Sequence, residues 1–265
     1  MSAAEAFARA RAEGRAALVG YLPAGFPDVP GAIEAIRVLV DSGADVIEIG
    51  LPYSDPVMDG PTIQAAAQRA LDGGVRTADV LATVEAVAAT GTPTLVMTYW
   101  NPVERYGVDR FAADLAAAGG AGLITPDLTP DSGREWIAAA DEHDLDKVFL
   151  VAPSSTDARL AMTTGQCRGF VYATAVMGVT GARERTSALA QPLVARTRAV
   201  TDLPIGVGLG VGTGAQAAEV ASYADGVIVG SALVRVLLDH DADPVQARRA
   251  LAALTEELAD GVRRA

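Results

Sequence analysis

The sequence predicts a (β/α)8 (TIM) barrel in a single domain, with an extra helix at its N-terminus. Eight short apolar segments recur along the 265 residues, and alanine-rich stretches with helical periodicity separate them. The segments are continuously apolar rather than alternating, as is typical of a parallel sheet that helices cover. Glycine-rich turns follow the last two segments, which favours a barrel over the competing prediction, a doubly wound open sheet. No low-complexity linker divides residues 1–265, so we expect one domain.

The predicted elements alternate along the whole chain. The opening segment, within residues 1–15, has the pattern of a short amphipathic helix. Strands are predicted at ALVGYL (17–22), DVIEIG (45–50), TLVMTY (94–99), AGLIT (121–125), KVFLV (147–151), GFVYAT (169–174), PIGVGL (204–209) and GVIVG (226–230). Helical periodicity is clear at 30–43, 108–120 and 213–224. The helical pattern at 61–91 is interrupted by LDGGV (71–75), which predicts two helices, and 244–265 is predicted to be the closing helix.

Composition narrows the function. A net charge of -12, with a sequence pI near 4.6, argues against a nucleic-acid binder or an acidic-membrane binder. A small anion remains compatible, because backbone N–H groups at a helix N-terminus hold phosphate without any net positive charge. The single cysteine excludes an intramolecular disulfide, and the sequence has neither a secretory signal pattern nor an apolar run of membrane-spanning length. We therefore expect a cytoplasmic protein.

The stretch EIGLPYSDPVMDGPTIQ (48–64) begins with a glutamate at the end of an apolar run. In residues 45–50 the side chains alternate, so Glu48 shares a face with Val46 while Ile47 and Ile49 share the other. If the isoleucines meet the helices, Glu48 faces the barrel interior near its C-terminal mouth, where catalytic groups of such barrels lie. A buried glutamate is costly without a partner or a chemical role. The alternative is a structural ion pair with an arginine or hydrogen bonds from backbone amides.

Two further acids, Asp55 and Asp59, lie in the loop that follows. The prolines and Gly60 predict a loop that doubles back over the mouth of the barrel. Either aspartate could be a solvated turn or capping residue, since Asp59 just precedes a helix with Pro61 in its first turn. Residue chemistry alone leaves the role of Asp59 open.

Glycines cluster where the seventh and eighth strands end, in GVGLGVGTGA (206–215) and GVIVGSALV (226–234). Glycine allows the backbone to approach a ligand, and a following helix N-terminus offers unpaired N–H groups, so both turns predict a phosphate site. The pattern matches neither a dinucleotide fingerprint nor a P-loop, and tight βα turns are the alternative explanation. After the sixth strand, VMGVTGARERT (176–186) has the composition of a mobile lid or of an ordinary exposed loop.

The sequence has few residues that could bind a metal or form a Schiff base. Cys167, His143 and His240 have no metal-ligand spacing, and we expect both histidines to be solvated. The only lysine, Lys147, opens its strand and so belongs at the opposite end of the barrel, which also disfavours pyridoxal phosphate (PLP) bound by this chain. Carboxylate acid–base chemistry on a phosphorylated small molecule remains.

The glutamate stretch resembles the signature of the tryptophan synthase alpha subunit family. The resemblance continues at YLPAGFPD (21–28), MTYWNPVERYG (97–107), LITPDLTPDSG (123–133), APSST (152–156), GFVYATAVMGVTG (169–181), GVGLGV (206–211) and GVIVGSALV (226–234). It implies a barrel that cleaves indole-3-glycerol phosphate to indole and glyceraldehyde 3-phosphate by a retro-aldol reaction. By that likeness Glu48 shuttles protons, and Asp59 accepts a hydrogen bond from the indole N–H.

The resemblance also implies binding residues. Tyr172 matches the tyrosine beside the glutamate, and Thr180 with Gly181 matches the lid. The phosphate site is implied at Gly181, Leu209, Gly210, Gly230 and Ser231. The indole pocket is implied at Tyr21, Met97, Tyr99 and Ile124, for which barrel core is an equally good explanation. Three residues depart from the family's common pattern: Met58, Leu209 and Val176.

The family works as a heterotetramer of two alpha and two beta subunits, with allosteric coupling and channelling of indole through a tunnel. The resemblance implies that PLP belongs to the beta subunit and that this chain has no cofactor. The positions implied to face the partner are Asp55, Pro56, Asn101 and Pro102. Other hypotheses are a free-standing indole-glycerol-phosphate lyase, a synthase or isomerase barrel of the same pathway, and a non-catalytic phosphate-binding barrel that activates a partner.

Overall fold

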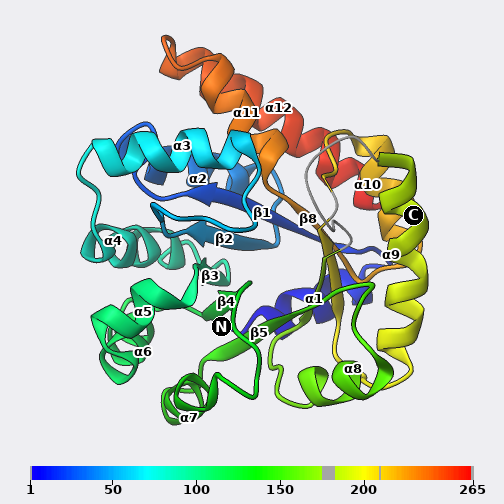
Figure 1. Cartoon of the computed structure of the whole chain (residues 1–265). Helices are drawn as coiled ribbons and strands as arrows, with labels where there is room; N and C mark the ends of the chain where they lie inside the picture. Colours follow the sequence, from blue (N-terminus) through cyan, green and yellow to red (C-terminus); the bar gives the residue numbers. More distant parts are fainter. Residues whose placement is uncertain (1, 175–182, 209, 264–265) are drawn as a thin grey trace.

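The computed structural model describes residues 2–174, 183–208 and 210–263. Eight parallel strands close into a barrel in the order β1 to β8, and helices surround them as a ring (Figure 1). The predicted barrel is confirmed and the open sheet is wrong, because β1 pairs with β8 as well as with β2.

The strands fall where the apolar segments predict them. They are β1 Ala17–Pro23, β2 Val46–Gly50, β3 Thr94–Met97, β4 Gly122–Thr125, β5 Asp146–Val151, β6 Val171–Thr174, β7 Ile205–Gly208 and β8 Gly226–Val229. The helices are α1 Ala3–Ala12, α2 Val29–Asp41, α3 Pro61–Asp72, α4 Thr77–Ala88, α5 Trp100–Tyr106, α6 Val108–Ala117, α7 Arg134–Glu142, α8 Asp157–Thr164, α9 Arg183–Arg198, α10 Gly214–Ala221, α11 Ser231–Asp239 and α12 Pro244–Arg263. The interrupted pattern at 61–91 is indeed two helices, α3 and α4.

Alternation along the strands divides the core in two. One face of each strand packs against the helices, and the other fills the barrel as an inner column. Strand residues of the inner column include Ala17, Val19, Val46, Leu95, Ile124, Val148 and Ile228, and Phe170 joins them just before β6. Ile47 and Ile49 belong to the outer cluster and Val46 to the inner column, so Glu48 faces the interior as predicted.

The N-terminal helix α1 closes the barrel at the end where the strands begin. Its apolar residues Ala3, Ala6, Phe7 and Ala10 recur at helical spacing, and all are buried in the inner column. The Phe7 ring stacks on Phe170 with the ring centroids 5.0 Å apart. Ser2 caps the helix by accepting a hydrogen bond from the Ala4 amide.

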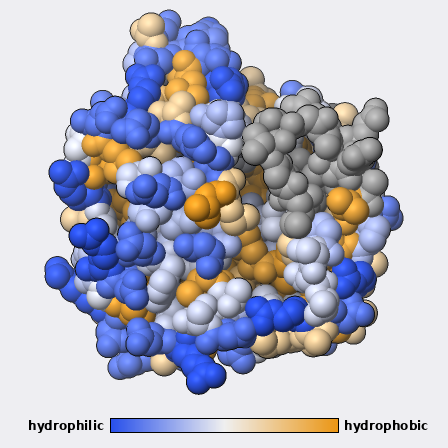
Figure 2. Space-filling model, in the orientation of Figure 1, coloured by the Kyte–Doolittle hydropathy of each residue, from blue (hydrophilic) through white to orange (hydrophobic). Residues whose placement is uncertain are grey.

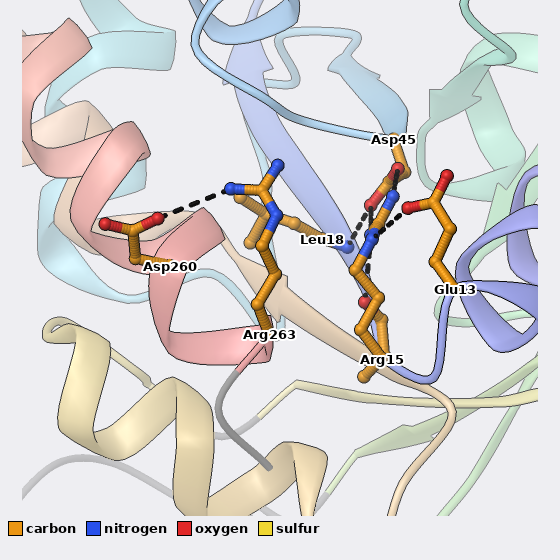
Figure 3. A network of polar contacts seen from close by, with 7 residues as sticks. Glu13, Arg15, Leu18, Asp45, Asp260 and Arg263 are labelled. Atoms are coloured by element: carbon orange, nitrogen blue, oxygen red, sulfur yellow. Dashed lines mark hydrogen bonds and ion pairs between the residues drawn. The ribbon is translucent and has the colours of Figure 1, made fainter.

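A polar cluster fixes the turn between α1 and β1. The Arg15 guanidinium donates to both oxygens of Asp45, at 2.7 and 2.8 Å, and to Glu13 at 2.7 Å (Figure 3). Asp45 also accepts from the Leu18 amide at 2.8 Å. These bonds tie α1 to the starts of β1 and β2, the strand that carries Glu48.

Over the described residues, no helix is both long and apolar enough to cross a membrane.

Candidate active site

Glu48 is a buried carboxyl group without a partner. Its side chain is 1% exposed. Within the part of the chain that the structure describes, neither of its carboxyl oxygens has a hydrogen-bond partner. The alternative of a structural ion pair or of amide hydrogen bonds is therefore not found among these residues. Burial raises the pKa of Glu48 from 4.5 to about 8, because the charged form is poorly solvated there.

Two tyrosines flank Glu48. Tyr21 of β1 lies directly across from Glu48 in the strand register, and the burial of its ring raises its pKa well above the usual value. Tyr172 of β6 is likewise raised by burial, and the charge of Glu48 raises it further. Both phenols are therefore neutral groups beside the carboxyl.

Inward-facing glycines make room for these rings. A Cβ atom on Gly50 would lie 2.2 Å from the Tyr21 hydroxyl, and one on Gly208 would lie 2.5 Å from the Tyr172 hydroxyl. Sequence reasoning assigned the glycines around the end of β7 to phosphate binding or to a tight βα turn and missed this steric role. The available signal is a glycine on the same strand face as the site, here at the last residue of both β2 and β7.

Asp59 is held by Tyr99, which precedes α5. The Tyr99 hydroxyl oxygen accepts hydrogen bonds from the amides of Met58 at 2.9 Å and Asp59 at 3.2 Å. Burial raises the pKa of the Asp59 carboxyl, and a hydrogen bond with Tyr99 opposes that rise. Helix α3 begins after Gly60 without any side-chain cap, so Asp59 is not its capping residue.

Both acids act electrostatically on one group. The negative charges of Asp59 and Glu48 each raise the pKa of the Tyr21 hydroxyl, with Asp59 the stronger of the two. The two carboxyl groups therefore both lie near the Tyr21 hydroxyl. One is mounted on a strand and the other on a loop.

The two glycine-rich turns differ at their helix ends. Helix α11 begins after Gly230 without a side-chain cap, so the first amides of the helix, from Ser231 on, are open to an anion. Helix α10 is closed, because Thr213 caps it and the Gly214 amide donates to Glu257 at 2.7 Å. Two of the amides that were expected to bind an anion at the start of α10, those of Gly214 and Gln216, are therefore already bonded.

Gly210 nevertheless remains a candidate phosphate contact. It lies ahead of the closed α10 terminus, and a Cβ atom there would meet nothing within 4 Å. Its φ of +78° is a conformation that favours glycine. The open amides of α11 and this glycine are the described parts of the predicted phosphate site.

The loop after β2 and helix α5 form one exposed surface. Val57 and Met58 are exposed hydrophobic residues, at 77% and 48%. The Asn101 side chain donates to the Tyr53 hydroxyl at 3.1 Å, and the Tyr53 and Tyr99 rings lie 5.3 Å apart. Asp55 and Asn101 are exposed, while Pro56 and Pro102 are half-buried. Hydrophobic residues are visible toward the centre of the view in Figure 2 and hydrophilic ones around much of its rim.

Sequence reasoning missed the residue that holds α5. Both carboxyl oxygens of Asp127, in the loop after β4, accept from the Trp100 amide, at 3.0 and 3.1 Å. An aspartate at a strand's C-terminal end was the available signal, but its target lies 27 residues away in the chain.

Two residues of the predicted indole pocket lie in or against the barrel core, and the lysine and histidines lie elsewhere. Ile124 is fully buried in the inner column, whereas Met97 is partly buried against it. Lys147 pairs with Asp141 of α7, outside the barrel interior. The histidines are half-buried rather than fully solvated, and no metal-binding group of His, Cys, Asp and Glu occurs among the described residues.

The last four residues of the predicted lid, 183–186, are helical and form the first turn of α9 instead of a loop. Val176, Thr180, Gly181 and Leu209 lie outside the described residues.

Comparison with known proteins gives one consistent family. The sequence profile described as "Tryptophan synthase alpha chain" matches residues 7–263. The tryptophan synthase alpha chain of Salinispora arenicola is 67% identical over 258 residues, covering 97% of this chain and 96% of the relative. That of Acidothermus cellulolyticus is 65% identical over 260 residues, covering 98% and 96%.

Solved structures agree with the sequence relatives. A structure of Mycobacterium tuberculosis tryptophan synthase superimposes with a TM-score of 0.91 at 60% identity, covering 98% of both chains. Tryptophan synthase subunit alpha from Legionella pneumophila gives a TM-score of 0.88 at 32% identity, covering 99% of this chain and 98% of that one.

Proposed function

The chain belongs to the tryptophan synthase alpha chain family and is a lyase that cleaves indole-3-glycerol phosphate; we propose that Glu48 and Asp59 carry out its proton chemistry. The observation that carries this proposal is the environment of Glu48. A buried carboxyl group that has no partner and faces the mouth of a barrel costs stability, and catalysis gives a reason for it.

Glu48 transfers the protons in this mechanism. With a pKa of about 8, its carboxyl group is protonated at neutral pH and can donate to C3 of the indole ring. The resulting carboxylate assists removal of the proton from the hydroxyl on the adjacent glycerol carbon. That oxygen becomes the aldehyde oxygen as the carbon–carbon bond breaks and its electron pair returns to the ring. Glu48 thus ends as it began, and no net proton is consumed.

Asp59 stabilises charge on the ring. Protonation at C3 places positive charge on the indole nitrogen, and a carboxylate that accepts the N–H hydrogen bond opposes that charge. Tyr99 supports this role because it holds the loop amides and the Asp59 carboxyl together. The position on a loop allows Asp59 to adjust to the ring after substrate binds.

The remaining parts of the site bind and position the substrate. The open amides at the start of α11, with Ser231 and Gly210, are suited to the phosphate. Three tyrosines are suited to the indole side of the site, because Tyr21 and Tyr172 interact with both acids and Tyr99 interacts with Asp59. Thr180, Gly181 and Leu209 complete the proposal from the family pattern.

The proposal includes a partner. The surface formed by the loop after β2 and α5, with Asp55, Pro56, Asn101 and Pro102, faces a beta subunit in a complex of two alpha and two beta chains. Its exposed Val57 and Met58 support this assignment. Indole passes to that subunit, which holds the PLP, and this chain works without a cofactor in the cytoplasm.

The decisive experiment measures indole formation after substitution of each acid in β2 and in the loop that follows it. Glu48→Gln and Asp59→Asn should each reduce indole formation by about 10²–10⁴-fold, while calorimetry shows that substrate still binds. Asp55→Asn is the matched control, since this exposed aspartate should leave cleavage by the chain alone unchanged. Near-normal cleavage in both Glu48→Gln and Asp59→Asn would falsify the assignment. Turnover should be measured with and without the beta subunit, because binding without any cleavage would indicate a non-catalytic activator.

A further inference from the structure

The inner column connects the N-terminal helix to the surroundings of Glu48. Its members run from Ala3, Ala6 and Phe7 of α1 to strand residues deep in the barrel. Two of these border Glu48 directly: Val46 precedes it on the same strand face, and Leu95 is its register partner on β3. The apolar surface beneath Glu48 is therefore continuous with the helix that closes the opposite end.

Phe7 is the largest side chain by which α1 enters this column. It is 2% exposed and stacks on Phe170, whose ring centroid lies 6.5 Å from that of Tyr172. A Cβ atom on Gly226 of β8 would lie 2.5 Å from the Phe7 ring, so the ring fills the space left by that glycine. The aromatic series Phe7, Phe170 and Tyr172 leads from the closed end to the tyrosine beside Glu48.

Exclusion of water dominates the environment of Glu48. Among the described residues, the titratable groups that the charge of Glu48 affects are Tyr21 from β1 and Tyr172 from β6, and Asp59 from the following loop acts on the same two tyrosines. Its neighbour on β3, Leu95, is apolar. The charged residues of α1 (Glu5, Arg9 and Arg11) are all exposed and do not belong to the column. Burial is also the cause of the raised pKa of Glu48, so any path for water should lower that pKa.

We propose that Phe7 is a positioning residue for Glu48, because it closes the far end of the barrel against water and supports the apolar column on which Glu48 rests. The functional value of this arrangement rests on the proposed role of Glu48 as the proton donor. The N-terminal helix then acts on the reaction from the end of the barrel opposite to the substrate.

The test measures the Glu48 carboxyl directly. The enzyme is labelled with ¹³C-carboxyl glutamate, and the Glu48 resonance is assigned by its loss in Glu48→Gln. The wild-type resonance should titrate with a midpoint of about 8. Phe7→Asn leaves a space that is both larger and polar, conditions under which water enters, so the midpoint should fall by about one pH unit or more. Phe7→Leu keeps an apolar side chain there and should restore most of the wild-type midpoint.

Phe111 of α6 provides the matched control. It is as fully buried as Phe7 but belongs to the outer cluster between helices and strands. Phe111→Asn should lower stability without moving the Glu48 midpoint. If Phe7→Asn fails to fold, Phe7→Ala is measured in its place, with a smaller fall expected.

Two results would overturn the proposal. One is an unchanged midpoint in a folded Phe7 variant with a polar or truncated side chain, and the other is an equal fall in Phe111→Asn. The resonance is read without turnover, so this outcome is independent of whether Glu48→Gln loses cleavage. In the wild type and the Phe7 variants, kcat/KM measured against pH should shift by the same amount as the resonance.

Discussion

Two buried carboxyl groups at opposite ends of the barrel have opposite environments. Asp146 at the start of β5 is 0% exposed, and Glu48 within β2 is 1% exposed. Asp146 accepts hydrogen bonds from the Ser2 hydroxyl at 2.9 Å and the Ala3 amide at 2.8 Å, and it lies 3.6 Å from the Arg168 guanidinium. Glu48 has no such partner among the described residues. The two carboxyl groups are therefore equally buried, but within the described ranges only Asp146 is hydrogen-bonded.

The pKa values of the two groups express the same difference. Burial raises the pKa of Asp146, but the Ala3 amide, the Ser2 hydroxyl and Arg168 each oppose that rise. For Glu48, burial acts alone and carries the pKa to about 8. Burial by itself thus does not mark a functional acid. A buried acid without hydrogen-bond donors is the informative observation, because its burial destabilises the fold and no structural contact offsets that cost.

The largest expected effect is on the pH dependence of folding. Between pH 4.5 and about 8 the folded state holds a proton on Glu48 that the unfolded state has released. Wild-type stability therefore falls as pH rises through that window, by about 5 kcal/mol if the full shift applies. Glu48→Gln removes this dependence. Its free energy of unfolding, relative to wild type, should rise across the window in denaturant titrations at successive pH values.

A flat difference between the two proteins over that window would contradict the description of Glu48. Only the slope is diagnostic, because the glutamine amide brings its own pH-independent cost of burial. Asp146→Asn should change the pH dependence of stability less, because the donors around Asp146 oppose the rise in its pKa.

The next effect concerns Asp146. Asp146→Asn replaces a carboxylate that accepts hydrogen bonds from two donors, the Ser2 hydroxyl and the Ala3 amide, and borders a guanidinium, so it should destabilise the fold by about 2–3 kcal/mol. Cleavage at the other end of the barrel should stay within about twofold of wild type, because the substituted group touches no part of the site and the apolar residues of α1, Phe7 among them, still fill the inner column. Chemical denaturation and steady-state turnover measure the two quantities.

Asp144→Asn is the matched control for that experiment. Asp144 pairs with the same arginine at 2.7 Å, but its side chain is 88% exposed. Its replacement should leave stability unchanged within error. If Asp146→Asn behaved like this exposed control, the buried hydrogen bonds would not be structural, and the comparison with Glu48 would fail.

Local patterns predicted the fold and the direction of Glu48. Continuous apolar segments located the strands, and alternation with Ile47 and Ile49 pointed Glu48 inward. Both are properties of residues close together in the chain. The predicted interruption of the helical region at 71–75 likewise follows from local glycines.

The features that the sequence did not predict depend on contacts between residues far apart in the chain. Glu257 closes the N-terminus of α10 from 43 residues away, and Tyr99 holds Asp59 from 40 residues away. No spacing rule connects such pairs. The lack of a partner for Glu48 is even less accessible, since it depends on every side chain that packs nearby.

The smallest expected effect is on the pH dependence of kcat/KM, which also separates Glu48 from Asp146. Glu48 must carry a proton when it donates to the indole ring, so kcat/KM should fall about tenfold per pH unit above a midpoint near 8. Asp146→Asn should keep this alkaline limb. The residual activity of Glu48→Gln should lack it. Initial rates over pH 6 to 10 at substrate concentrations well below KM would measure all three proteins.

Agreement between two midpoints is the strongest form of this test. The pH profile of kcat/KM reports groups in the free enzyme, and so does the pH dependence of unfolding. If Glu48 is responsible for both, the alkaline limb of the rate should begin where wild-type stability stops falling. An alkaline limb that persists in Glu48→Gln would assign it to a group other than Glu48. The unpartnered acid at the mouth would then cost stability without serving the reaction.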